Sequence, residues 1–362
     1  QMVDQDTLRA SIGAVEDPLL HRSLESLGMV REVAAGRLGK TRVEVALAVP
    51  NHPFQEELTQ KVVEAAEAAG SKAINLDFTL MTDDERSEMM KMLWPNRDSV
   101  GGAGSRTRVI GISSGKGGVG KSSVTSNLAV ALTRLGKSVG IIDADVWGFS
   151  IPKMMGAAYS PIVVDESMIA PETHGVKVMS MDYFVADDQA VIWRGPMLHK
   201  AMEQFLVDVF WDDPDFLLID MPPGTGDIAI SLSQFLPRAQ VLVVTTPQPA
   251  AQRVAKRAAL MAEKVNQEVL GVIENMSWFT GDDGKQYKLF GEGGGAALAG
   301  EIGSELLGQI PLVPAMREGA DEGRPVVIAD PDGEADVAFR QLAQAVIDRK
   351  PRIRTHPDLV IK

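Results

Sequence analysis

The chain has 362 residues, of which 45% are hydrophobic and 23% charged, so it is long enough for about two globular domains with a core each. Its formal net charge of −13 argues against a broad electrostatic surface for nucleic acid or anionic lipid and leaves a local basic patch open. Cysteine is absent, which excludes disulfides, thiolate nucleophiles and metal sites built from thiolates of this chain.

The first residues carry no secretion signal. Residues 1–10 are polar and acidic, and they lack the basic segment followed by an apolar one that marks a signal peptide. No uninterrupted apolar run in the sequence reaches the roughly 18 residues needed to span a bilayer. We therefore expect a cytoplasmic protein with no membrane span.

Residues 1–93 are predicted to form a small α+β domain. Alternating side chains at 43–49 indicate a strand, which prolines end, and residues 73–80 indicate a second, returning strand. No catalytic constellation is apparent in this domain. The helices expected from apolar residues at helical spacing are 5–15, 19–27 and 54–69.

A flexible linker is predicted at 94–107, where a proline, three glycines and polar residues favour coil. The domain that follows, 108–362, alternates apolar strands with helical stretches. Strands that are nearly continuous in apolar residues are typical of a parallel sheet covered on both faces. We therefore expect a doubly wound, mostly parallel α/β sheet that binds its ligand at the carboxyl ends of the strands. The expected strands are 109–113, 139–144, 216–220, 241–246, 269–274 and 309–311.

The segment between the first of these strands and the next helix is rich in glycine. Closely spaced glycines let the backbone curl with its N–H groups inward, which forms a cradle for a polyphosphate at a helix N-terminus. Lys121 is expected to reach the β- and γ-phosphates, and the Ser122 hydroxyl suits Mg²⁺. A surface loop with incidental glycines is the alternative. The residues expected to bind the nucleotide here are Gly115, Lys116, Gly117, Gly118, Val119, Gly120, Lys121, Ser122 and Ser123.

Polar residues follow the later strands, at the edge where such a sheet binds its ligand. The strand that ends at Asp220 has Walker B order, so Asp220 is expected to hold Mg²⁺ directly or through water. Gly224 follows it and is expected to donate its N–H to a γ-phosphate. Asn275 offers an amide for the edge of adenine, with the capping of a turn as an open alternative. Asp143 and Asp145 follow the second strand, where an acidic turn is the alternative to a role in catalysis.

The order Lys-Gly-Gly-Val-Gly-Lys-Ser resembles the deviant Walker A loop of the MinD/ParA/Mrp ATPases. The resemblance implies a homodimer that sandwiches two ATP molecules, with Lys116 acting across the interface. An exposed lysine without a role is the alternative. The resemblance also implies that Asp145 orients the attacking water and that Asp143 is a supporting or metal-linked carboxylate. The expected catalytic residues are Lys116, Lys121 and Asp145, and the expected Mg²⁺ residues are Ser122, Asp143 and Asp220.

Further motifs make residues 108–347 similar to the Mrp/ApbC proteins, P-loop ATPases regarded as iron–sulfur cluster carriers. These motifs are 193–197, 220–227, and 290–291 followed by three glycines at 293–295. The N-terminal domain resembles the iron–sulfur-assembly domain often fused ahead of such ATPases. The resemblance implies ATP, Mg²⁺ and a [4Fe–4S] cluster as cofactors, and apoprotein clients or iron–sulfur assembly proteins as partners.

The usual cluster ligands of that family are missing. Many members have a Cys-x-x-Cys pair shortly after the Asn-Met-Ser segment, where residues 278–285 of this chain contain no thiol. In the N-terminal domain, relatives often have a cysteine where this chain has Asn51-His52-Pro53. Thiolates hold iron–sulfur clusters, so the usual cluster site cannot form in this chain. Asp282 and Asp283 are hard ligands and are interpreted as part of an acidic turn.

We expect an ATP-hydrolysing, dimeric factor in iron–sulfur cluster assembly or transfer, either an adaptor or a protein that holds a cluster with a partner's thiols. A MinD/ParA-like positioning or scaffold ATPase is the alternative, and it would need a membrane-seeking C-terminal helix or a basic DNA face. The apolar stripe of Phe339, Leu342, Val346 and Ile347 is better explained by a helix packed on the core. A dinucleotide-dependent redox enzyme is disfavoured, because that class does not require the lysine and serine of the loop. No nucleic-acid partner is expected.

Overall fold

Two compact units make up the chain, of which the computed structural model describes residues 4–36, 39–146, 148, 150–184, 195–224 and 227–352. The first unit combines Gln1–Arg97 with Ile162–Ile169, and the second combines Asp98–Pro161 with Ala170–Lys362. The division into 1–93, a linker at 94–107 and 108–362 stays a prediction. Within the expected linker, Val100 is buried and its N–H donates to the Leu206 carbonyl at 3.1 Å, so this residue packs within the second unit.

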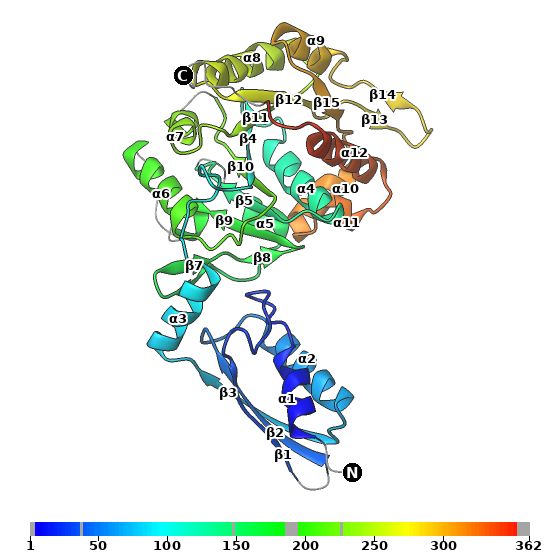
Figure 1. Cartoon of the computed structure of the whole chain (residues 1–362). Helices are drawn as coiled ribbons and strands as arrows, with labels where there is room; N and C mark the ends of the chain where they lie inside the picture. Colours follow the sequence, from blue (N-terminus) through cyan, green and yellow to red (C-terminus); the bar gives the residue numbers. More distant parts are fainter. Residues whose placement is uncertain are drawn as a thin grey trace. The chain divides into compact units, whose positions relative to one another are not determined.

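The first unit is built on a sheet with the order β1 (Val30–Ala35), β2 (Lys40–Leu47), β3 (Ala73–Leu80). β1 and β2 are antiparallel, whereas β2 and β3 are parallel and joined by the crossover helix α2 (Gln55–Ala68). The buried residues of α2 are spaced four apart, so they form one face of the helix. α1 (Gln5–Gly13) packs beside α2 and against β1 (Figure 1).

Two later segments complete the first unit. α3 (Asp83–Leu93) follows β3 and begins at a capping box. A hairpin from a distant part of the chain, β6 (Ile162–Val164) and β7 (Ser167–Ile169), also belongs to this unit. Arg97 donates to the Glu166 carboxylate of that hairpin at 3.2 Å. The unit is therefore assembled from two stretches of sequence.

The prediction of a helix at 19–27 is wrong, because these residues form turns. Asp17 caps a single turn: its carboxylate accepts hydrogen bonds from the N–H groups of Leu19 and Leu20 at 2.9 and 2.8 Å, as an N-cap does. His21 then has a φ of +53°, which ends the turn before a helix can continue. The sequence pattern also indicated neither β1 nor α3. The expected helix at 54–69 and the expected strand at 73–80 are confirmed.

The second unit is built on a sheet with the order β15-β12-β11-β4-β10-β5-β9-β8. Neighbouring strands from β15 to β9 are parallel, and among the described strands of this sheet only β8 runs antiparallel to its neighbour. The expected doubly wound, mostly parallel α/β sheet is therefore confirmed. The strands are β4 (Arg108–Ser114), β5 (Val139–Asp143), β8 (Glu172–Thr173), β9 (Val176–Ser180), β10 (Phe216–Asp220), β11 (Gln240–Thr245), β12 (Glu268–Glu274) and β15 (Leu306–Gln309).

The last strand differs from its prediction at 309–311. β15 spans Leu306–Gln309 and pairs with β12. Pro311 has no N–H to donate to a ladder, so the strand ends before it. Beside the sheet, a short hairpin is formed by β13 (Phe279–Thr280) and β14 (Gln286–Tyr287).

Helices cover both faces of this sheet (Figure 1). Leu242 and Val244 of β11 pack with α4 and α12 on one face, while Val241 and Val243 pack with α8 and α9 on the other. Both faces of a strand are therefore apolar, which explains the continuous apolar runs of the sequence. The helices are α4 (Lys121–Arg134), α5 (Ile151–Met155), α6 (Gly195–Val207), α7 (Asp227–Phe235), α8 (Pro249–Lys264), α9 (Gly294–Glu301), α10 (Pro314–Glu322), α11 (Val326–Ala329) and α12 (Glu334–Asp348).

The C-terminal helix α12 buries its apolar stripe. Phe339, Leu342 and Val346 are at most 1% exposed and belong to the core that α12 shares with α4 and the sheet. The interpretation of this stripe as the core side of a helix is therefore confirmed. Within the described residues, no helix combines the length and the apolar character that crossing a membrane requires.

Candidate functional site

The carboxyl ends of the central strands meet at the glycine-rich loop. β4 lies between β11 and β10, and β5 lies beyond β10. In the register of these strands, Asp220 pairs with Ile112 on one side and with Asp143 on the other. Both carboxylates therefore lie at the sheet edge where the loop after Ser114 begins. This is the edge at which parallel α/β sheets bind their ligands.

The loop at residues 115–120 has a conformation that requires glycine. Gly118 and Gly120 have φ values of +81° and +79°, which residues with a side chain rarely adopt. Gly115 is constrained by space instead, because a Cβ atom there would lie 2.1 Å from the carbonyl carbon of Val254 in α8. The loop is thus pressed against α8 on one side and leads directly into α4 on the other.

A cavity of about 190 Å³ lies against this loop and the N-terminus of α4. A helix N-terminus attracts an anion, because its first N–H groups have no partner within the helix and its dipole is positive there. Of the expected nucleotide-binding residues, Gly115, Gly224 and Asn275 do not line the cavity. The lining residues are Ser114, Lys116, Gly117, Gly118, Val119, Gly120, Lys121, Ser122, Ser123, Asp145, Ser150, Met154 and Pro223.

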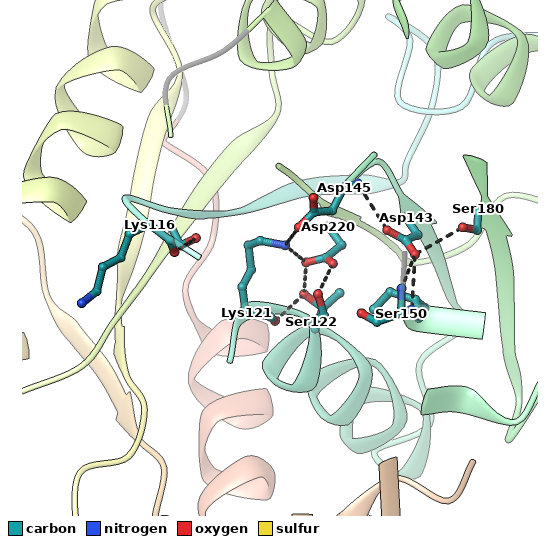
Figure 2. Close-up of polar contacts among 11 residues, drawn as sticks. Lys116, Lys121, Ser122, Asp143, Asp145, Ser150, Ser180 and Asp220 are labelled. Atoms are coloured by element: carbon teal, nitrogen blue, oxygen red, sulfur yellow. Dashed lines mark hydrogen bonds and ion pairs between the residues drawn. The ribbon is translucent and has the colours of Figure 1, made fainter. Parts of the chain in front are cut away.

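Lys121 joins two of the expected carboxylates. Its Nζ atom lies 2.7 Å from Asp220 Oδ1 and 3.3 Å from Asp145 Oδ2 (Figure 2). Ser122 Oγ donates to Asp220 Oδ2 at 2.6 Å, and Thr125 Oγ1 donates to Asp220 Oδ1 at 3.0 Å. Lys121 is 6% exposed and Asp220 is fully buried. In this arrangement the ammonium group offsets the charge of two carboxylates, and two hydroxyls complete the hydrogen bonding of Asp220.

The oxygen atoms around Asp220 fit Mg²⁺. Burial raises the pKa of Asp220, while the ammonium of Lys121 and the hydroxyls of Ser122 and Thr125 act in the opposite direction. Mg²⁺ takes oxygen ligands, and it commonly binds through one or two carboxylates together with the phosphates of a nucleotide. Among the described residues there is no cluster of His, Cys, Asp or Glu that could hold a metal ion by itself. The carboxylate of Asp220 and the hydroxyl of Ser122 therefore suit Mg²⁺ that arrives with a nucleotide.

Asp143 supports the segment that carries Asp145. Its Oδ1 atom accepts the Asp145 N–H at 3.3 Å. Its Oδ2 atom accepts the N–H groups of Ser150 and Ile151, at 3.3 Å each, and the Ser180 hydroxyl at 3.2 Å (Figure 2). These contacts are compatible with a supporting role for Asp143, and both expected roles, support and Mg²⁺ binding, stay predictions.

Asp143 is expected to make the free energy of unfolding depend on pH. Burial, and then the neighbouring Asp220, raise the pKa of Asp143 to about 7. From an unfolded pKa of about 4 up to pH 7, the folded chain binds more protons than the unfolded chain, so stability falls as the pH rises through this window. In metal-free buffer, Asp143→Asn should flatten the profile of stability against pH, as measured by urea unfolding. Parallel profiles for the variant and the parent would contradict the raised pKa.

Two other expected residues have different surroundings. Lys116 is exposed, and its side chain points away from the carboxylates in Figure 2. Gly224 has a φ of +94°, and its N–H donates to the Ser114 carbonyl at 2.9 Å. A hydrogen bond from Gly224 to a γ-phosphate would require this bond to break. The roles of both residues therefore stay predictions.

Asn275 braces the loop. Its side chain is buried, and Nδ2 donates to the Val119 carbonyl at 2.9 Å. A Cβ atom at Gly120 would lie 2.3 Å from the same nitrogen, so the amide and the loop are in close contact. Asn275 is 2% exposed, which leaves almost no surface for a base. The structure thus favours a third role over the two that the sequence left open, and the contact with adenine stays a prediction.

Sequence reasoning missed two hydroxyls of this site. Thr125 lies one helical turn after Lys121, so a spacing of four residues could have placed it beside Asp220. Ser180 ends β9, a strand that no sequence pattern indicated, and it pairs in register with Asp143. No local signal in the sequence connects residues 143 and 180.

The segments in which relatives often have thiols form local contacts. Residues 282–284 form the turn between β13 and β14, where Asp283 Oδ2 accepts the Tyr287 hydroxyl at 2.7 Å. The interpretation of this segment as an acidic turn is therefore confirmed. In the first unit, His52 Nε2 lies 3.0 Å from Asp17 Oδ2, and the other ring nitrogen accepts a backbone N–H. Both nitrogens of this buried histidine are thus engaged within the unit.

Known proteins are similar in sequence to this chain over most of its length. Residues 105–347 match the family model described as NUBPL iron-transfer P-loop NTPase, and residues 5–74 match the model described as iron-sulfur cluster assembly protein. Over 354 residues the chain is 44% identical to the iron-sulfur cluster carrier protein of Mycobacterium tuberculosis, a match that covers 95% of this chain and 93% of the relative. The protein of the same name from Escherichia coli is 40% identical over 354 residues, covering 96% of this chain and 93% of the relative.

A solved structure also resembles a large part of this chain. The nucleotide-binding protein of Archaeoglobus fulgidus, determined in complex with ADP, is 33% identical and has a TM-score of 0.55. The match covers 71% of this chain and 97% of that protein.

Proposed function

Because the chain belongs to the NUBPL iron-transfer P-loop NTPase family, we propose that it is a dimeric, Mg·ATP-hydrolysing factor that helps to deliver iron–sulfur clusters to apoproteins. The observation that carries the nucleotide part is the cavity at residues 115–123, where the loop meets the start of α4 beside Lys121 and Asp220. The ADP complex of the Archaeoglobus relative supports the same part. The relatives named as cluster carriers support the delivery of clusters.

The side chains divide the work of hydrolysis among them. Lys121, which lines the cavity, leaves Asp220 and Asp145 and binds the β- and γ-phosphate oxygens. Asp220 and Ser122 would hold Mg²⁺, which would neutralise charge on the phosphates. Asp145 lines the cavity and, once Lys121 has moved, accepts a hydrogen bond from water in line with the leaving phosphate. Asp143 holds the Asp145 segment in place through its N–H.

The iron–sulfur cluster is cargo that this chain does not hold with thiolates of its own. The sequence contains no cysteine, and the described residues contain no cluster of metal-ligating side chains. Sulfide clusters are held by soft thiolate ligands, so the acidic turn at 282–284 does not fit one. The chain therefore acts as an adaptor, or it holds a cluster through the thiols of a partner. α12 packs into the core, so the scaffold alternative loses its candidate for a membrane-seeking helix.

Two measurements test this function in turn. Calorimetry with Mg·ATP and a phosphate-release assay address the nucleotide part. Anaerobic transfer of a cluster from a thiol-bearing donor to an apoprotein, with and without this chain and ATP, addresses the delivery. ATP-dependent acceleration of the transfer is expected. A chain that hydrolyses ATP but never changes the transfer rate would refute delivery while leaving the ATPase intact.

Lys116 is expected to act in the partner's site. Lys116→Ala should bind nucleotide normally, because the side chain is exposed and makes no contact with Lys121 or Asp220, but it should lose at least tenfold in hydrolysis. Asp145→Ala should be inactive with ATP bound. In a symmetric dimer, mixing the two variants creates heterodimers with one complete site, so about a quarter of the parent activity should return.

In the matched control for this mixing experiment, one of the two chains carries both substitutions. Lys116→Ala mixed with the double variant Lys116→Ala/Asp145→Ala should restore no activity. Normal hydrolysis by Lys116→Ala alone, or no recovery in the first mixture, would show that this lysine does not act across a dimer.

A further inference from the structure

We propose that the second unit has another ligand site, at the sheet edge opposite the glycine-rich loop, which binds a small oxyanion bearing a phosphate or carboxylate group. A cavity of about 180 Å³ lies at the beginning of β4 and β11. Its lining includes three arginines, Arg106, Arg108 and Arg238, together with Thr107. Such a concentration of positive charge stands out in a chain whose net charge is −13.

Arg108 is a partly buried cation that has no carboxylate partner. Its guanidinium donates to the carbonyls of Val346 and Arg349 and to Gln240 Oε1, at 2.8 Å each, and it lies over the ring of Phe216. All three acceptors are neutral. Among the described residues, no carboxylate lies within ion-pair distance of Arg106, Arg108 or Arg238. Burying a charge without a counter-ion costs free energy, which an anionic ligand would offset.

Two buried polar atoms at the cavity also lack partners. Within the described part of the chain, Arg108 Nε and Thr107 Oγ1 are shielded from solvent and make no hydrogen bond. Thr107 as a whole is 9% exposed. Buried polar atoms are nearly always paired, and an unpaired one often marks an absent water or ion. A donor N–H and a hydroxyl on adjacent residues of the cavity lining are the kinds of group that pair with an oxyanion.

The nearby carboxylate of Glu268 does not pair with the arginines of the cavity. Burial lowers the pKa of Arg108, and the negative charge of Glu268 acts in the opposite direction. However, its carboxylate accepts Gln240 Nε2 at 3.0 Å and the Arg352 N–H at 3.1 Å, and it is not part of the cavity lining. No carboxylate of the described residues therefore pairs with the arginines of the cavity, and an anionic ligand from solution would do so.

The site is separate from the nucleotide cavity. β4 begins at Arg108 and ends at Ser114, so its seven residues place the two sites on the order of 20 Å apart. One ligand cannot reach both. Arginine guanidinium groups present paired N–H donors that match phosphate and carboxylate geometry, which defines the class of ligand.

Thermal unfolding of the full chain in the presence of Mg·ADP, which occupies the glycine-rich loop, tests the proposal. Inorganic phosphate at several times its dissociation constant should raise Tm by about 2–4 °C over sodium chloride of equal ionic strength. Malonate is tested in the same way as a ligand that bears carboxylate groups. A larger shift with phosphate assigns a phosphate ligand, and a larger shift with malonate assigns a carboxylate. The double variant Arg106→Ala/Arg238→Ala should lose most of the shift, whereas the surface variant Arg317→Ala should keep it.

Thr107→Val keeps the experiment decisive if the double variant folds poorly. Without phosphate its Tm should equal or exceed that of the parent, because an unpartnered hydroxyl is removed. With phosphate it should gain at most half of the parent's shift. Equal shifts in the parent, the double variant and Thr107→Val would overturn the proposal, as would a shift that sodium chloride reproduces.

Discussion

Lys121→Met is expected to abolish ATP hydrolysis and to lower the free energy of unfolding by about 3 kcal/mol, because it removes the only positive charge that pairs with Asp220 in the described residues. The Nζ atom makes a 2.7 Å contact with a carboxylate that is fully buried. Without it, the pKa of Asp220 rises further. The stability lost should therefore be larger at pH 8 than at pH 5.5, since an acid with a raised folded pKa destabilises the fold progressively above its unfolded pKa.

Two measurements distinguish the role of Lys121 in stability from its role in hydrolysis. Urea unfolding at both pH values measures stability, and phosphate release measures turnover. The double variant Lys121→Met/Asp220→Asn should recover stability but no activity, because the buried charge is gone and the phosphates still lack their lysine. Lys116→Ala is the matched control for stability, since that side chain is exposed. A Lys121→Met chain as stable as the parent at pH 8 would refute the balancing of charge described here.

Gly115→Ala is expected to destabilise the chain by about 2–4 kcal/mol and to impair nucleotide binding. The added Cβ would lie 2.1 Å from the carbonyl carbon of Val254 and 2.3 Å from the N atom of Ala255. Both atoms belong to the backbone of α8, so no side chain can turn aside to make room. Either α8 or the loop has to move, and the loop lines the nucleotide cavity.

A neighbouring glycine provides the control. Gly117→Ala adds the same methyl group where nothing lies within 4 Å, and its φ is not positive. Its stability should be unchanged or about 0.5 kcal/mol higher, because alanine restricts the unfolded chain. Urea unfolding of both variants gives the comparison. Equal stabilities would mean that the contact between the loop and α8 is looser than the structure shows.

Most of the second unit followed from local sequence patterns. Its strands are buried on both faces, which produces apolar runs that are visible without a structure. Asp143, Asp145 and Asp220 could be placed at one edge because parallel strands end together. The bracing of the loop by Asn275 could not be predicted in this way, because the Val119 carbonyl that Asn275 binds lies 156 residues away in sequence. The need for glycine at position 115 could not be predicted either, because it comes from a close contact with α8 and not from a backbone angle.

The first unit was harder to predict because tertiary contacts decide its elements. Residues 19–27 were expected to be helical, yet the turn that Asp17 caps ends at His21, whose φ of +53° is not helical. Local propensity also says nothing about the hairpin at 162–169, which belongs to this unit although it lies far along the chain. A pattern of nearest neighbours cannot reveal such a return.

That return has a consequence for how the protein can be divided. The chain passes between the units three times, at 97–98, 161–162 and 169–170. A protease that cuts once near residue 100 would divide the first unit itself, because residues 162–169 would stay on the fragment that carries the second unit. A shortened protein starting at residue 98 would keep the hairpin but lose Arg97, its partner. Ile151 precedes this excursion and Ser180 follows it, and both of these residues donate to Asp143. Removing the hairpin would thus join, by a shorter path, two segments that the nucleotide site needs in their present places.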